Sequence, residues 1–193
     1  VHGHWEKGPG LSLFGKMQET FGEINLIAED LGFVTDSVQK LVEDTGFPGM
    51  KVLQFAFDSR EESNYLPHCY PHNCVVYTGT HDNDTIRGWY EALIPEDRKM
   101  AVCYMNSQRT PGSEIHWDFI RLALASVADL AVIPLQDYLG LGAEARINEP
   151  STLGKNWKWR LLPGEITGDV LKQCRRMAKL YGRLPETVSD INM

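Results

Sequence analysis

The sequence predicts an α/β fold in which this chain forms half of a parallel (β/α)8 barrel. Four short apolar segments alternate with helical patterns or long loops along the 193 residues, which is typical of parallel strands joined by right-handed crossovers. Each segment ends in polar residues, as strands do at the ligand-binding edge of such folds. A complete barrel typically needs about 250 residues, so four strands amount to half of one.

The composition is that of an ordinary globular protein, with 42% hydrophobic and 23% charged residues and no internal repeat or low-complexity segment. A formal net charge of −7 argues against nucleic acid or an anionic membrane as the main partner, because both select for basic surfaces. The sequence contains no apolar run of about 18 residues that would predict a membrane span, and its N-terminus lacks the pattern of a signal peptide. We therefore expect a cytoplasmic protein with neutral or polar ligands.

The chain opens on Val1 instead of Met, so we expect a trimmed start or a piece of a longer protein. Its four cysteines are too few and too scattered for a disulfide framework, and we expect reduced thiols. The segment from His68 to Cys74 holds four potential zinc ligands but no C-x-x-C pair. An ordinary loop is favoured there over a metal site.

The first predicted elements are a helix, a strand and a second helix. A Gly-rich loop leads into a helical stretch over Leu11–Phe21, and the apolar run Ile24–Ala28 predicts the first strand, which ends in Glu29. Thr35 is a suitable N-cap for the next helix, which Gly46 is expected to end.

The second and third strands follow on either side of a polar loop. The segment Met50–Phe57 predicts a strand, residues 58–73 a long loop, and Val75–Thr78 a buried strand. Gly79 then frees the backbone, and residues 80–84 are all polar. Helices are expected from Ile86, from Pro95 and over 113–127.

The last predicted strand is Leu130–Leu135, which ends in Gln136 and Asp137 and tolerates Pro134 near its end. Residues 140–159 are irregular and polar, and helices are expected over 167–181 and 186–193.

Glu29 and Asp82 each lie just beyond a predicted strand. If both face the same end of the sheet, they form a carboxylate pair. Two carboxyl groups in different environments can divide the work of glycoside chemistry, one donating a proton and the other stabilising positive charge. The residues alone therefore indicate an acid/base enzyme that acts on a sugar.

Other roles for these residues stay open at this point. Glu29 and Asp30 could cap the following helix, as acids after a strand often do. His81, Asp82 and Asp84 could instead bind a hard cation, or act in a metal-dependent hydrolase.

The aromatic residues add weak support for a sugar ligand. Trp157 and Trp159, with Trp5, Trp89 and Phe55, could stack on sugar rings. For Trp157 and Trp159, burial of one face of an extended segment is favoured over stacking. No P-loop, G-x-S-x-G, C-x-x-C or dinucleotide fingerprint is present.

Several long sequence blocks are similar to one known family. Together they resemble the 4-α-glucanotransferase family, also called amylomaltase or disproportionating enzyme, from about Trp5 to Arg160. The blocks are I-A-E-D-L-G at 27–32, G-F-P-G-M-K-V-L-Q-F-A-F at 46–57, Y-L-P-H at 65–68, V-V-Y-T-G-T-H-D-N-D-T at 75–85, L-A-L-A-S-V-A-D-L-A at 122–131, P-L-Q-D-Y-L-G-L-G at 134–142 and N-W-K-W-R at 156–160.

This resemblance implies the C-terminal half of a (β/α)8 barrel, about strands five to eight, in an enzyme that transfers α-1,4-glucan segments between chains or to glucose by a retaining double displacement. It implies maltooligosaccharides, starch or glycogen fragments as partners and neither a cofactor nor a metal. Glu29 matches the general acid/base and Asp82 the aspartate that stabilises the transition state. His81 matches a neighbour that hydrogen-bonds the sugar, Phe55 an aromatic residue of the pocket, and Asn148 lies in a loop that borders the acceptor side of the groove.

Two departures from the family pattern matter. The family's nucleophilic aspartate lies in an R-x-D-H-type segment at the end of strand four, and no such segment occurs here. We therefore expect residues 1–193 to form the part of the catalytic barrel that follows this strand. Alone, the chain is expected to be an inactive half-barrel or at most a weak glucan-binding module. Ser151 also stands where the family tends to carry Gly after the loop proline.

Overall fold

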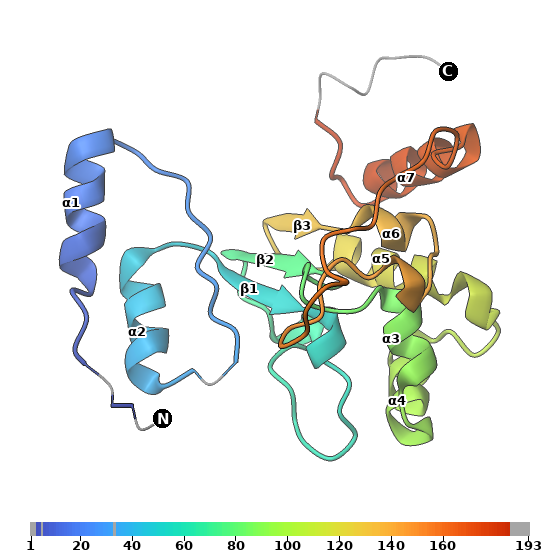
Figure 1. Cartoon of the computed structure of the whole chain (residues 1–193), viewed down its shortest axis with the longest axis horizontal. Coiled ribbons are helices and arrows are strands. Elements are labelled where there is room, and N and C mark those ends of the chain that lie inside the picture. The colour runs from blue at the N-terminus through green and yellow to red at the C-terminus, as the bar shows by residue number, and fades with distance from the viewer. Residues whose placement is uncertain (1–2, 5, 33, 186–193) are drawn as a thin grey trace.

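The computed structural model describes residues 3–4, 6–32 and 34–185. Within these residues, the centre of the fold is a parallel three-stranded sheet (Figure 1). Its strands, in spatial order, are β1 (Gly49–Val52), β2 (Cys74–Tyr77) and β3 (Leu130–Val132). Val75 of the middle strand pairs with Met50 on one side and with Leu130 on the other. The mixed α/β class and the parallel strand direction that the sequence predicts are confirmed.

Helices accompany the sheet at both ends of its strands. They are α1 (Leu11–Phe21), α2 (Asp36–Thr45), α3 (Ile86–Ala92), α4 (Pro95–Met105), α5 (Ile115–Ala125), α6 (Leu135–Tyr138) and α7 (Gly168–Leu180). Figure 1 shows α1 and α2 to the left of the sheet and α3 to α7 on the side toward which the strands point. The six helices expected between residues 11 and 181 are confirmed, and the helix expected over 186–193 lies outside the described residues. No helix in the described ranges is long and apolar enough to cross a membrane.

The residues at the helix ends explain where these helices begin and stop. The Thr85 hydroxyl accepts a hydrogen bond from the Gly88 N–H at the start of α3. Pro95 opens α4, where its missing N–H costs nothing. Gly46 ends α2 in the left-handed region, with φ of 70°, as the sequence predicts.

The strand expected over Ile24–Ala28 is not formed in the described structure, and this expectation is wrong. Only one parallel bridge joins Ala28 to Gly49 at the outer edge of β1. The backbone N–H of Met50 donates to the Asp30 carboxylate at 2.7 Å. In a continuing strand, a backbone carbonyl would accept from the Met50 N–H. Here the Asp30 side chain accepts from it instead.

Two other expected strands are shorter than the sequence suggests. β1 ends at Val52 and passes into a 3-10 turn over Leu53–Phe55, within which the Gln54 amide donates to the Asp84 carbonyl at 2.7 Å. β3 ends at Val132, and Pro134, which has no N–H for the ladder, precedes α6. Three strands and a bridge thus replace the four expected strands.

The main core lies between the sheet and α3 to α5, and it is rich in aromatic rings. Phe119 of α5 is fully buried. Its ring centroid lies 5.9 Å from that of Phe57 and 5.5 Å from that of Trp89, both in edge-on geometry. Such pairs each add about 0.5–1.5 kcal/mol beyond the burial of their area.

A buried carboxylate joins three elements at the carboxyl end of the sheet. Asp137 of α6 is 1% exposed. Its oxygens accept from the Thr78 hydroxyl at 2.5 Å, directly after β2, and from the Ile86 N–H at 2.8 Å, at the start of α3. Burial raises the pKa of Asp137 to about 6, and the nearby Asp84 charge acts in the same direction, while the two hydrogen bonds oppose it. Gln136 and Asp137 therefore belong to a helix and not to a strand end, contrary to the sequence prediction.

Replacing Asp137 with Asn should change how stability depends on pH. The folded-state pKa lies above the ordinary value of 3.8, so the stability that comes from the neutral carboxyl is present below about pH 4 and lost as the pH rises through about 6. The stability advantage of the native protein over Asp137→Asn should then shrink by about 3 kcal/mol between pH 4 and pH 7. Urea unfolding at several pH values measures it, with exposed Glu62→Gln as the control. An advantage that stays constant with pH would contradict this assignment.

Candidate functional site

A tight turn directly after β2 carries the polar cluster that the sequence singles out. The Asn83 side-chain oxygen accepts from the Thr80 N–H at 2.9 Å and from the Thr80 hydroxyl at 2.8 Å. The Asn83 N–H donates back to the Thr80 carbonyl at 3.2 Å. The turn is thereby closed on itself and presents His81 and Asp82 at its tip, where their side chains are 53% and 46% exposed.

The loop that follows α6 holds Asp82 in place. The Asn148 side-chain amide donates to the Asp82 carboxylate at 2.6 Å, and the Arg146 guanidinium donates to the Asp82 carbonyl at 2.7 Å and to the Asn148 carbonyl at 2.8 Å. The His81 Nε2 atom lies 3.4 Å from the Asp82 carboxylate. Arg146 and Asn148 thus hold both the backbone and the carboxylate of Asp82.

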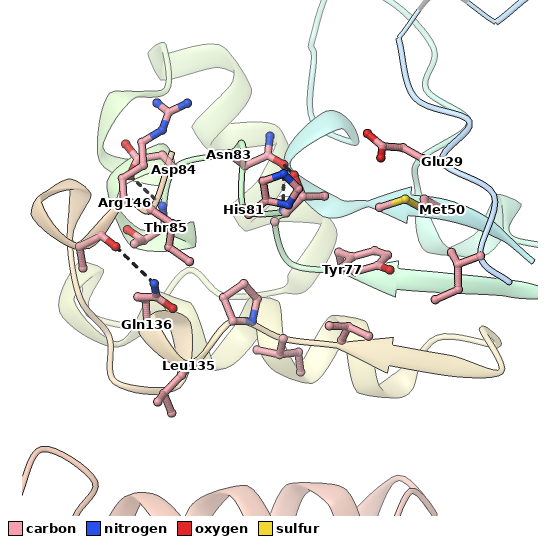
Figure 2. A pocket seen from close by; sticks show the side chains of 18 residues that line it. Glu29, Met50, Tyr77, His81, Asn83, Asp84, Thr85, Leu135, Gln136 and Arg146 are labelled. Carbon is pink, nitrogen blue, oxygen red and sulfur yellow. Dashed lines mark hydrogen bonds between the residues drawn. The ribbon is translucent and has the colours of Figure 1, made fainter. Parts of the chain in front are cut away.

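A cavity of about 540 Å³ opens beside this turn, at the carboxyl end of the sheet. Glu29, Met50, Tyr77, His81, Asp84 and Arg146 are among the residues that line it. Figure 2 shows Glu29 on one side of the cavity and Arg146 on the other, with His81 between them. The structure thus places Glu29 and the His81 turn around the same space.

Glu29 and its neighbour Asp30 have different environments. Glu29 is exposed and faces the cavity. Burial raises the pKa of the Tyr77 hydroxyl, and the Glu29 charge adds to this effect, so the two groups interact across the cavity wall. Asp30 binds the Met50 N–H. The N-cap of α2 is Thr35 and no side-chain hydrogen bond caps this helix, so neither Glu29 nor Asp30 caps the following helix through a hydrogen bond.

Phe55 is apart from the other predicted site residues. It lies in the 3-10 turn after β1, is 41% exposed and packs edge-on against Tyr65, with ring centroids 5.4 Å apart. Phe55 is not among the residues that line the cavity. His81, Asp82 and Asn148 are brought together. Of the predicted site residues, Glu29 and His81 line the cavity, whereas Asp82 and Asn148 lie beside it and are not among its lining residues.

The metal alternatives have no geometric support in the described residues. No three His, Cys, Asp or Glu side chains there form a group that could hold an ion. In the segment considered for zinc, the His68 ring bonds the Tyr104 hydroxyl at 3.0 Å and the buried Cys74 thiol donates to the Pro71 carbonyl at 3.1 Å.

Sequence reasoning missed the exposure of Trp157 and the role of Arg146. Trp157 is 57% exposed and its ring lies against that of His81, with centroids 5.3 Å apart, so the expectation of burial is wrong for it, while Trp159 is half-buried. Nothing in the sequence indicated this exposure, because aromatics at alternate positions, such as Trp157 and Trp159, usually face a core. A basic residue two positions before Asn148 could have suggested an anchor, but nothing local tied it to Asp82.

A parallel α/β sheet with a cavity at its carboxyl end, lined by acids and an imidazole, has the layout of the ligand-binding sites of α/β-barrel enzymes. The sequence pattern of the family described as 4-alpha-glucanotransferase matches residues 1–165. This chain belongs to the 4-alpha-glucanotransferase family.

Individual relatives agree with this assignment. The chain is 48% identical over 189 residues to a 4-alpha-glucanotransferase from Thermus thermophilus, which covers 95% of the chain and 38% of that protein. It is 45% identical over 183 residues to one from Clostridium butyricum, covering 94% and 37%. Its fold matches the amylomaltase from Streptococcus agalactiae in complex with acarbose with a TM-score of 0.89 at 34% identity, covering 94% of the chain and 37% of that protein. The chain thus spans little more than a third of its relatives, less than the half that the strand count suggested.

The loop from Arg146 to Trp157 contains a strained turn at Ser151, where the sequence resemblance leads us to expect Gly. The Thr152 N–H donates to the Glu149 carbonyl at 3.3 Å, which makes Pro150 and Ser151 the central residues of a turn. Ser151 has φ of 65°, and the third position of such a turn favours Gly because a side chain there is strained.

Replacing Ser151 with Gly should therefore stabilise the protein by about 0.5–1 kcal/mol, because the relief of strain exceeds the entropy cost of Gly. Thermal unfolding measures this, and Ser151→Ala, which keeps the β-carbon, should bring no gain. Equal effects of the two substitutions would show that backbone strain is not the cause.

Proposed function

We propose that this chain is the C-terminal part, about strands five to eight, of a (β/α)8-barrel 4-α-glucanotransferase. The whole protein would transfer α-1,4-glucan segments between glucan chains or to glucose. The observation that carries the proposal is the placement of Glu29 across a cavity from the Asp82 turn, which the Arg146 and Asn148 contacts hold. The complex of the Streptococcus agalactiae amylomaltase with acarbose supports a sugar ligand.

In this proposal, Glu29 gives a proton to the oxygen of the departing glucan end as its bond to the anomeric carbon breaks. An aspartate outside these residues forms a bond to that carbon and holds the glucosyl group covalently. Glu29 then takes the proton from an incoming 4-hydroxyl, whose oxygen displaces the aspartate. The configuration at the anomeric carbon is retained overall because each of the two displacements inverts it.

The other predicted residues have supporting roles in the proposal. Ionised Asp82 stabilises the positive charge that develops on the sugar ring in both steps. His81, which lines the cavity, hydrogen-bonds the substrate, and Asn148 and Phe55, which are not among the lining residues, contact it at the margin of the cavity. The reaction as proposed involves no cofactor and no metal, and its substrates are maltooligosaccharides, starch or glycogen fragments and glucose.

Changing Glu29 to Gln in the complete protein should reduce maltotriose disproportionation by about 10²- to 10⁴-fold, because Gln can neither give nor take the proton. Release of glucose and longer maltooligosaccharides measures the rate. Glu23→Gln, at an exposed acid six positions earlier, is the control and should leave the rate unchanged. Full activity of the Glu29→Gln variant would show that Glu29 is not the general acid/base.

A second candidate is that the 193-residue chain alone is an inactive fragment or a weak glucan-binding module. The outer strand of the described sheet favours it, because Leu130 and Val132 of β3 expose their side chains although parallel strands are normally covered on both faces. Sheet edges with unpaired backbone groups also favour association between copies of the chain.

The purified 193-residue chain should then show no glucan transfer and no glucose release from maltotriose, while the complete protein shows both. Size-exclusion chromatography should detect association of the isolated chain. Transfer by the isolated chain would overturn the second candidate and the assignment of the nucleophile to a segment outside it.

A further inference from the structure

Trp157 has an unusual position beside the proposed site. Its ring and the His81 ring have centroids 5.3 Å apart and planes inclined by 36°, while 57% of the residue remains exposed. A large aromatic side chain at the surface gains little from burial, so its position needs another explanation. The contact with His81 is the ring contact that the structure gives for it.

The backbone of Trp157 is in a conformation that bulky residues rarely adopt. Its φ is 63°, in the left-handed region where a side chain is strained. Two hydrogen bonds hold it there: the Trp157 N–H donates to the Ile147 carbonyl at 2.7 Å, and the Arg160 guanidinium donates to the Trp157 carbonyl at 2.9 Å. Strained residues of this kind cluster at functional sites.

The same loop reaches the neighbouring Asp82. Arg146 and Asn148, at its beginning, bind the Asp82 carbonyl and carboxylate, and Trp157, at its end, meets His81. Between them the Asn156 side chain bonds Glu149 and closes the loop on itself, with its oxygen 3.0 Å from the Glu149 N–H. One closed loop therefore holds both residues at the tip of the turn.

We propose that Trp157 is a positioning residue that fixes the orientation of the His81 imidazole, an inference that rests on the proposed sugar-binding role of His81. The imidazole is half-exposed, and its Nε2 atom is 3.4 Å from the Asp82 carboxylate, which is longer than the 2.7–3.2 Å of a typical N–H···O hydrogen bond. That contact leaves the ring free to turn about its side-chain torsions. The indole ring restricts these rotations by packing against the imidazole, and the two backbone hydrogen bonds of Trp157 hold the residue in place.

The test measures glucan transfer by the complete protein with substitutions at both rings. Trp157→Ala should lower kcat/KM about threefold to tenfold, the range expected for the loss of one aromatic pair, and Trp157→Phe should recover most of it. Lys158→Ala, at the exposed next residue, should have no effect. Thermal unfolding of each variant, with Trp157→Gly as a second truncation that relieves the φ strain, separates these effects from a loss of folding.

A double-mutant cycle with His81→Ala decides whether Trp157 acts through His81. Trp157→Ala should cause no further loss in the His81→Ala background. Losses that multiply would overturn the inference while leaving the proposed function in place, because Trp157 would then act independently of the imidazole. Unchanged transfer by His81→Ala alone would overturn both the role of His81 and the inference, and the Glu29→Gln result would show separately whether the proposed reaction survives.

Discussion

The hydrogen bonds of the buried Asp137 carboxylate fix the two ends of the segment that carries the site. Thr78 lies directly before the turn and Ile86 begins the helix after it, and both donate to the same carboxylate. The seven residues between them must therefore leave the sheet and return within a fixed span. Gly79 makes this possible, because a β-carbon there would collide with the Gln54 amide, which itself holds the end of this segment through the Asp84 carbonyl.

The loop from Arg146 to Trp157 supplies the second constraint, from outside the sheet. It contains two non-glycine residues with positive φ, Ser151 and Trp157, and each costs free energy of order 1–3 kcal/mol. A loop that served only to connect α6 to α7 would have no need of such strain. Its ends reach Asp82 and His81, so the strain belongs to the part of the chain that shapes the proposed site.

The sequence predicted what depends on local pattern and missed what depends on distant partners. Helix ends at Gly46 and Pro95 follow from backbone restrictions of single residues, and β2 from an unbroken apolar run, so all three could be predicted. Strand lengths could not, because β1 stops where the Gln54 side chain reaches a carbonyl thirty positions later. For the site, Glu29 and the His81 turn could be predicted from their place after apolar runs. The contact between the exposed Trp157 and His81 could not, because the two residues are far apart in the chain.

The four acids around this end of the sheet show how environment separates roles that the sequence leaves equal. Burial raises the pKa of Asp137 and of Asp84, and both are occupied by backbone N–H groups. Both therefore have structural roles, and in the described residues Asp84 does not form a metal-binding group with His81 and Asp82. Asp82 is half-exposed with an amide donor on its carboxylate, and Glu29 is exposed and faces the cavity. Among these four acids in the described structure, Glu29 and Asp82 are the two whose carboxylates accept no backbone N–H. In the proposed reaction, the roles of proton carrier and charge stabiliser therefore fall to this pair.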